Sequence, residues 1–168
     1  MIYKINKGKH RAWPPAPGLF WNKKTLQRVV SFDISAKYDL PGTEDDEDVN
    51  KLFGIGYLPG HHTDSARFGW VYNNASNKID VYAYCYVNGE RKIKFICAIN
   101  LFKRVLMVLD VLSDCYCFSV VDPKWTNLVL GSIDVKKDHD KKIGYRLGCY
   151  FGGNQTAPHK ITIEIKRK

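Results

Sequence analysis

The residues best suited to bind a polar ligand are concentrated between positions 60 and 73, where the sequence reads GHHTDSARFGWVYN. Tryptophan and tyrosine rings can stack against a sugar ring while their polar edges form hydrogen bonds. An arginine can hold a carboxylate through two parallel hydrogen bonds. We therefore take Arg67, Trp70 and Tyr72 as candidate ligand-binding residues. The alternative is that Trp70 belongs to the core and Arg67 to a surface ion pair.

The two histidines of this segment, His61 and His62, raise the questions of metal binding and catalysis. Adjacent side chains diverge and no third ligand is indicated by spacing, so we predict no metal site and no cofactor. A triad of Ser65, His62 and Asp64 can be written down. Residues this close in sequence rarely reach triad geometry, and the motif that places a nucleophile on a sharp turn is missing.

A second group of polar and aromatic residues lies between positions 144 and 160, ahead of an alternating segment at 161–165. Two consecutive glycines followed by Asn-Gln are typical of a well-defined turn between two strands. The candidate ligand-binding residues of this group are Arg146, Tyr150, Asn154 and Gln155.

The stretch from Tyr145 to Gln155 resembles the late strand of concanavalin-like jelly-roll proteins, including alginate-lyase-type polysaccharide lyases. In that family a basic residue, a glycine, a tyrosine and an Asn-Gln pair occur close together, and Arg146, Gly148 and Tyr150 match here. Three residues intervene before the Asn-Gln pair. The arginine-rich early motif and the Gln-x-His motif of the family are not found, although a lone arginine occupies a comparable strand.

The resemblance implies a jelly-roll sandwich and, if the chain is an enzyme, a lyase-like reaction. A lyase of this type uses a tyrosine as acid and base while an imidazole or an amide neutralises the substrate carboxylate. The candidate catalytic residues on this hypothesis are Tyr150, His62, His159, Arg67 and Asn154.

The elements that must position these residues are predicted to be strands. Apolar and polar residues alternate repeatedly, whereas a helical period of 3.6 residues is nowhere sustained. The expected strands span about residues 2–6, 28–35, 52–57, 66–73, 78–87, 91–99, 104–112, 115–121, 128–134, 144–151 and 160–166.

The Asn88-Gly89 pair predicts a hairpin over residues 78–99, because both residues accept the positive φ angles of a type I′ turn. Before the turn, alternation places three tyrosines on the face opposite the apolar residues. We therefore add Tyr82 and Tyr84 to the candidate ligand-binding residues.

Many short strands separated by turn residues are typical of a sandwich or a barrel. We predict an all-β, jelly-roll-type antiparallel β-sandwich in one domain over residues 1–168, with a lipocalin-like barrel as the alternative. Residues 10–27 are predicted to be a proline-rich wrapping loop, because proline cannot donate to a central ladder. The acidic cluster at 43–48 is predicted to be a solvated loop rather than a calcium site.

Composition narrows the class of protein further. The formal net charge of +9 favours polyanionic partners, but no nucleic-acid-binding motif accompanies it. The five cysteines, an odd number among apolar neighbours, are expected to be free thiols in a reducing compartment. No signal peptide or membrane-spanning run is recognised, so we expect cytoplasmic synthesis and no membrane partner.

The leading hypothesis is a non-enzymatic β-sandwich module that binds a glycan or a protein partner, as an oligomer or as a component of a larger assembly such as a phage particle. One alternative is a polysaccharide lyase-like enzyme. The other is a basic nucleic-acid-binding protein, which the charge alone suggests.

Overall fold

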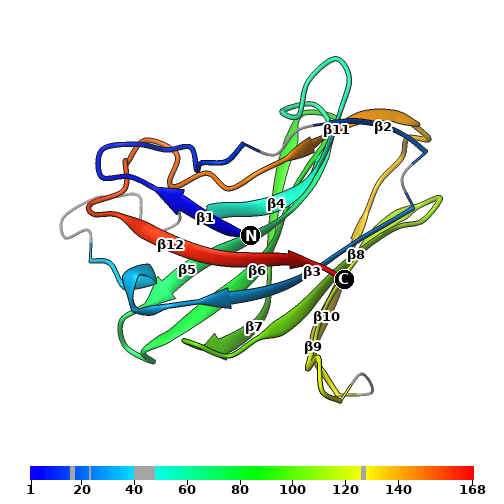
Figure 1. Ribbon diagram of the computed structural model, residues 1–168. Coiled ribbons are helices and arrows are strands. Elements are labelled where there is room, and N and C mark those ends of the chain that lie inside the picture. The colour runs from blue at the N-terminus through cyan, green and yellow to red at the C-terminus, as the bar shows by residue number, and fades with distance from the viewer. Residues whose placement is uncertain (16–17, 23, 40–47, 126–127) are drawn as a thin grey trace.

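The computed structural model describes residues 1–15, 18–22, 24–39, 48–125 and 128–168, and these form two antiparallel sheets packed face to face (Figure 1). Sheet A contains, in spatial order, β1 (Ile2–Ile5), β12 (Ile161–Arg167), β3 (Thr25–Phe32), β8 (Val105–Val111), β9 (Cys115–Val121) and β10 (Val129–Lys136). Sheet B contains β2 (Leu19–Trp21), β11 (Ile143–Leu147), β4 (Asn50–Tyr57), β5 (Ser65–Asn73), β6 (Lys78–Val87) and β7 (Glu90–Asn100).

The core lies between the sheets and is rich in aromatic rings. Phe68 of β5 meets Phe118 of β9 at 5.0 Å between ring centroids, and Phe32 of β3 meets Trp70 of β5 at 5.1 Å. Both pairs join opposite sheets, and all four side chains are at most 1% exposed. Each such burial contributes about 2–3 kcal/mol to stability. The predicted antiparallel sandwich is confirmed, and the lipocalin-like alternative is wrong because the described strands form two separate sheets rather than one closed barrel.

The β6–β7 hairpin forms as predicted. Val87 pairs with Glu90 across the turn, and Asn88 and Gly89 have φ angles of +52° and +81°. These positive values are the ones a type I′ turn requires. The hairpin places alternate β6 residues in the core and the intervening tyrosines on the outer face of sheet B.

Several predicted boundaries need correction. The segment 10–27 is not wholly a loop, because it contains β2 and the beginning of β3. The strand expected at 28–35 ends at Phe32, where the Asp33 side chain accepts a hydrogen bond from the Ser35 amide and caps a short 3-10 helix, η1 (Ile34–Ala36). The strand expected at 144–151 ends at Leu147.

The acidic cluster lies outside the described residues except for Asp48. That carboxylate accepts hydrogen bonds from the Gly153 and Asn154 amides and lies 3.4 Å from the Lys51 ammonium nitrogen. Asp48 thus anchors the turn after β11. None of the helices in the described part of the chain is long and apolar enough to cross a membrane.

Candidate ligand-binding site

The outer face of sheet B carries a cleft of about 450 Å³, which we call the sheet-B cleft. Strands β4, β5 and β6 form its floor, and the loops beside them form its walls. It is lined by Arg11, Asp48, Lys51, His61, His62, Ser65, Arg67, Tyr84, Tyr86, Arg91, Tyr150, Gly153 and Asn154. Four of these residues are arginine or lysine, three are tyrosine, and Asp48 is the one carboxylate among them.

Arg67 is a buried cation of the cleft. It projects from the outer face of β5, yet it is only 8% exposed. One terminal nitrogen donates to the Gly148 carbonyl at 2.7 Å, whereas Nε has no hydrogen-bond partner within the described structure. Burial lowers the pKa of Arg67 to about 10, so the group stays cationic at neutral pH. A buried cation with an unused donor is costly unless an acceptor arrives.

Gly54 makes room for this arginine. A Cβ atom at position 54 would lie 2.1 Å from the Ala66 carbonyl oxygen and 2.6 Å from the Arg67 Cα. These contacts are far below normal separations, so the close approach of β4 to β5 at this point requires glycine.

Lys51 lies between two of the tyrosines. Its ammonium nitrogen is 4.8 Å from the Tyr84 ring centroid and 6.0 Å from that of Tyr150, and it donates to the Gly152 carbonyl at 2.9 Å. Burial lowers the pKa of Lys51, and the charge of Asp48 partly opposes this change. The lysine therefore joins the floor of the cleft to the turn after β11.

Tyr150 forms one wall of the cleft. Its ring stacks on His10 with centroids 5.0 Å apart and an angle of 11° between the planes. Its backbone exchanges hydrogen bonds with Lys51, N to O at 2.8 Å in both directions. Both the ring and the backbone are thus fixed while the residue remains partly exposed.

The loop at 60–64 forms another wall of the cleft. The Tyr145 hydroxyl accepts from the His61 amide at 2.9 Å and lies 3.0 Å from its Nδ1. The His61 and His62 rings are 4.5 Å apart, and His62 contacts Tyr86 at 5.2 Å. Burial lowers the pKa of His61, and the charges of His62 and Arg67 lower it further.

No protein-family model matches the chain, and no curated protein matches it in sequence. Solved structures do match. The alginate lyase AlyC3 aligns with a TM-score of 0.58 at 12% identity, covering 99% of this chain and 72% of that one. The alginate lyase from Klebsiella pneumoniae aligns at 0.57 and 9% identity, covering 86% of this chain and 59% of that one.

The fold is a concanavalin-like jelly roll. The resemblance seen in the sequence around Tyr150 is therefore confirmed for the fold. The carbohydrate-binding module CBM66 from Bacillus subtilis also aligns, with a TM-score of 0.43 at 9% identity over 96% of this chain and 81% of that one. The alignable part of this chain spans only 59% of the Klebsiella lyase, and at 9–12% identity the likeness concerns the fold.

The jelly roll brings together five of the residues singled out in the sequence. Arg67, Tyr84, Tyr150, Asn154 and His62 all line the sheet-B cleft, although they come from two strands and two loops. Strand alternation correctly placed Tyr84 on the outer face of β6. It is nevertheless only 6% exposed, because Lys51 lies over its ring.

Two predicted ligand-binding residues must be withdrawn. Trp70 is fully buried between the sheets, and Tyr72 is 7% exposed with its hydroxyl donating to Asn77 Oδ1 at 2.7 Å. The physical reason is the two-residue period of β5, which sends Trp70 and Tyr72 inward and Arg67 outward. The core interpretation of Trp70 was the correct alternative.

Other predicted residues lie outside the cleft. Tyr82 packs against Phe95 further along the hairpin, and His159 bonds the Ser35 carbonyl through Nε2 at 2.8 Å. Gln155 is not among the lining residues, and Arg146 takes an inward position on β11.

The Ser65–His62–Asp64 triad does not form. Ser65 Oγ donates to the His61 carbonyl at 2.7 Å instead of to an imidazole. The Asp64 carboxylate accepts from the Asn88 amide at 3.0 Å and pairs with Lys141. The serine and the aspartate are thus each engaged by partners outside the triad.

Sequence reasoning did not select five of the basic and aromatic lining residues, which are Arg11, Lys51, His61, Tyr86 and Arg91. Tyr86 and Arg91 could have been found, because a two-residue turn at 88–89 places them directly opposite each other. Arg11 and Lys51 could not, because each reaches the cleft through an isolated backbone bridge to Tyr150.

The described side chains that could hold a metal ion lie on the other sheet. They are Cys115 and Cys117 of β9 and Asp134 of β10, with ligand atoms within 4.8 Å of one another. No residue of the sheet-B cleft belongs to this group. The five cysteines, all within the described residues, are unpaired.

Proposed function

We propose that this domain binds an acidic glycan in the sheet-B cleft. The observation that carries the proposal is Arg67, a buried cation with an unused Nε donor in a cleft that has four arginine and lysine side chains and one carboxylate. A carboxylate or sulfate group on a sugar would supply the missing acceptor. Arginine is well suited to this role because its planar fork bonds both oxygens of such a group.

The tyrosines of the cleft favour an acidic sugar over a simple anion as the ligand. Tyr84, Tyr86 and Tyr150 offer ring faces and hydroxyl groups beside the cations. The cleft volume of about 450 Å³ is within the usual range for sites that hold small organic ligands. Two alginate lyases share the fold, which makes uronate chains the first ligands to test.

The binding test uses calorimetry with oligouronates from alginate, polyglucuronate and a glycosaminoglycan, and with neutral dextrin as a control. We expect acidic chains alone to bind, and Arg91→Ala and Lys51→Ala to weaken binding about tenfold each. Arg104→Ala is the matched control, because this arginine is exposed, lies directly before β8 of sheet A and pairs with Glu164 at 3.5 Å. Equal binding of dextrin, or binding unchanged by the cleft variants, would disprove the proposal.

Single-stranded DNA of mixed sequence serves as the competing polyanion. If it binds as tightly as the best glycan and responds equally to the cleft variants, the ligand is a nucleic acid and the glycan proposal fails.

Cleavage of the bound chain by β-elimination is the second candidate function. Tyr150, His62, Asn154 and Arg67 line one cleft, as a lyase would need. In such a step Tyr150, acting first as the base, takes the proton from the carbon next to the carboxylate, a carbon–carbon double bond forms, and the bond to the leaving sugar oxygen breaks. Tyr150 would return a proton to that oxygen while Arg67 neutralises the carboxylate.

Absorbance of the unsaturated product separates the two functions. If the domain is a lyase, Tyr150→Phe abolishes the absorbance increase but keeps binding within about threefold, because only a hydroxyl is lost. Binding without any absorbance increase in the unmodified protein excludes elimination and leaves the binding function standing.

A further inference from the structure

Three arginines occupy strand positions that point into the gap between the sheets. Arg28 lies on β3 between the buried Leu26 and Val30, so strand alternation turns it inward. Arg167 follows the buried Ile163 and Ile165 at the same alternation on β12, at the exposed end of that strand. An inward strand position such as that of Arg28 would ordinarily hold an apolar residue.

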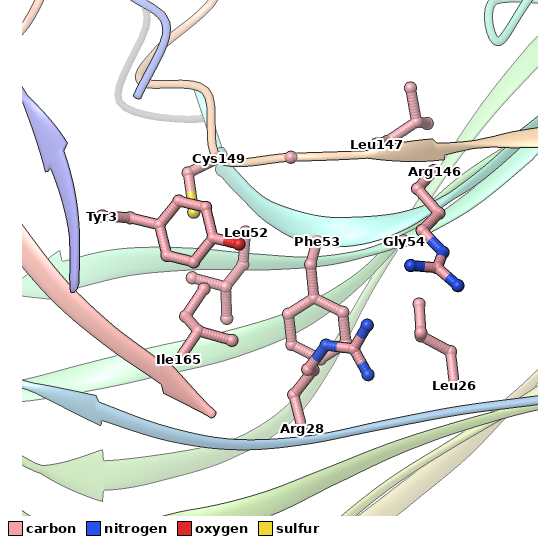
Figure 2. Close-up of a pocket in the computed structure, with 11 residues that line it drawn as sticks. Tyr3, Leu26, Arg28, Leu52, Phe53, Gly54, Arg146, Leu147, Cys149 and Ile165 are labelled. Atoms are coloured by element: carbon pink, nitrogen blue, oxygen red, sulfur yellow. The ribbon is translucent and has the colours of Figure 1, made fainter. Parts of the chain in front are cut away.

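Arg146 approaches from the opposite sheet. It pairs directly with the buried Ile55 of β4, and directly paired residues share a face of a sheet. Figure 2 shows the guanidinium groups of Arg28 and Arg146 extending into the same space from facing strands. On sheet A, Arg28 is the direct cross-strand partner of Arg167.

This arrangement is unfavourable for the domain alone. Like charges directly opposite each other on neighbouring strands destabilise a sheet. Within the described residues none of the three guanidinium groups forms an ion pair, and Arg28 bonds only the carbonyl of its neighbour Gln27, at 2.6 Å. Burial, followed by the charges of Arg167 and Arg146, lowers the pKa of Arg28.

The three side chains line a groove of about 530 Å³, together with Met1, Tyr3, Pro14, Pro15 and Ile165. A smaller cavity adjoins it and shares Tyr3, Arg28, Arg146 and Ile165 with the groove. Leu26, Leu52 and Phe53 also line that cavity and make one side of it apolar (Figure 2). None of the three arginines lines the sheet-B cleft.

We propose that this inter-sheet groove is a second binding site, in which Arg28, Arg146 and Arg167 hold one oxyanion group of the phosphate, sulfate or carboxylate type. Three converging guanidinium groups supply paired donors for several oxygens at once. The bound anion also relieves the repulsion between the paired arginines. The apolar side of the adjoining cavity suits a ligand that carries the anion on a small hydrophobic group.

The test is a titration with sodium phosphate, sulfate and acetate at constant ionic strength, with chloride as reference and thermal unfolding as the readout. We expect phosphate and sulfate to raise Tm above the chloride value, and phenyl phosphate to bind more tightly than inorganic phosphate. Arg28→Met, Arg146→Gln and Arg167→Gln should each weaken phosphate binding about tenfold. Equal stabilisation by all salts, or stabilisation that survives in all three variants, overturns the proposal.

Two control variants distinguish anion binding in the groove from binding in the sheet-B cleft and from a purely structural role of Arg28. Arg91→Gln removes a cation of the sheet-B cleft, so any part of the phosphate effect that this variant loses belongs to that cleft. The part that is lost only in the Arg28, Arg146 and Arg167 variants belongs to the groove, and it is measured whether or not the glycan proposal holds. Arg28→Met keeps the side-chain bulk, so in chloride its Tm should equal or exceed that of the unmodified protein. If its Tm falls by the same amount in chloride and in phosphate, Arg28 is structural and the proposed site is wrong.

Discussion

Arg67 is held by backbone atoms rather than by a carboxylate. Its guanidinium bonds the Gly148 carbonyl, and its main chain packs against Gly54. A residue fixed in this way does not depend on a partner that a ligand would have to displace. The positive charge therefore remains available to an incoming acidic group.

Substituting Gly54 tests this arrangement. Gly54→Ala should reduce the free energy of unfolding by about 1–3 kcal/mol, because the added methyl group overlaps the backbone of β5. Gly60→Ala is the matched control, since nothing lies within 4 Å of a Cβ there. Urea unfolding of both variants measures the difference. Equal stability of the two variants would show that β4 and β5 can separate at this point.

Two partly buried histidines should make the stability of the fold depend on pH. The pKa of His61 is lowered from its ordinary 6.5, chiefly by burial, and that of His139 is lowered in the same direction by burial. Below about pH 6.5 the unfolded chain takes up protons that the folded protein resists, so stability falls as pH decreases. We expect a drop between about pH 7.5 and pH 5.5 that is smaller in His61→Gln, measured by urea unfolding. An identical drop in that variant would exclude His61 as a source.

The two-residue period of a single strand was enough to predict which face a side chain occupies, and the ligand-binding prediction for Trp70 was wrong because it ignored that period. The period of β5 turns Arg67 outward and Trp70 inward, where Trp70 is fully buried. The inward direction of Arg146 depends on its pairing with β4. The alternation of residues within β11 does not indicate which residues of β4 they pair with.

At the scale of elements, the β6–β7 hairpin positions the loop at 60–64 as well as its own tyrosines. The Gly89 amide donates to the Thr63 carbonyl at 2.9 Å, and the Asn88 amide donates to the Asp64 carboxylate at 3.0 Å. The type I′ turn was predictable from the Asn-Gly pair. Its contacts with residues 63 and 64 were not, because they join segments that are distant in sequence.

Gly89→Ala should therefore affect more than the turn. A non-glycine residue at a φ of +81° is expected to lower the free energy of unfolding by about 1–2 kcal/mol. The amide signals of the loop at 60–64 should shift in NMR spectra, because their anchor moves. Glu90→Ala, an exposed change in the same hairpin, should alter stability by less than about 0.5 kcal/mol and leave those signals in place.

The strands were more predictable than their ends. Alternation located most of them, whereas β2 was missed because proline-rich surroundings suggested a loop and only pairing with β11 makes it a strand. The η1 turn was also missed. There Asp33 caps a short helix that interrupts an apparently continuous alternating segment.

At the scale of the whole molecule, the formal net charge is +9, and part of the excess positive charge is concentrated at the two proposed sites. Both proposed sites gather arginines that have few carboxylates nearby. Acidic ligands are therefore expected to bind faster and more tightly at low salt, because mobile ions screen these fields.

Binding of an acidic oligosaccharide should weaken about tenfold when NaCl rises from about 50 mM to about 500 mM. Calorimetry at the two salt concentrations measures this change. Arg91→Ala should show a shallower dependence than the unmodified protein, because one cation is lost from the cleft. Affinity that is independent of salt would point to recognition by ring stacking alone.

The placement of the four tryptophans gives the domain a built-in optical probe. Trp13, Trp21 and Trp125 are each at least 70% exposed, whereas Trp70 is enclosed between the sheets. Three of the indoles will fluoresce as they do in water whether or not the chain is folded. Any blue-shifted emission must then come from Trp70, so its loss reports separation of the two layers without a label.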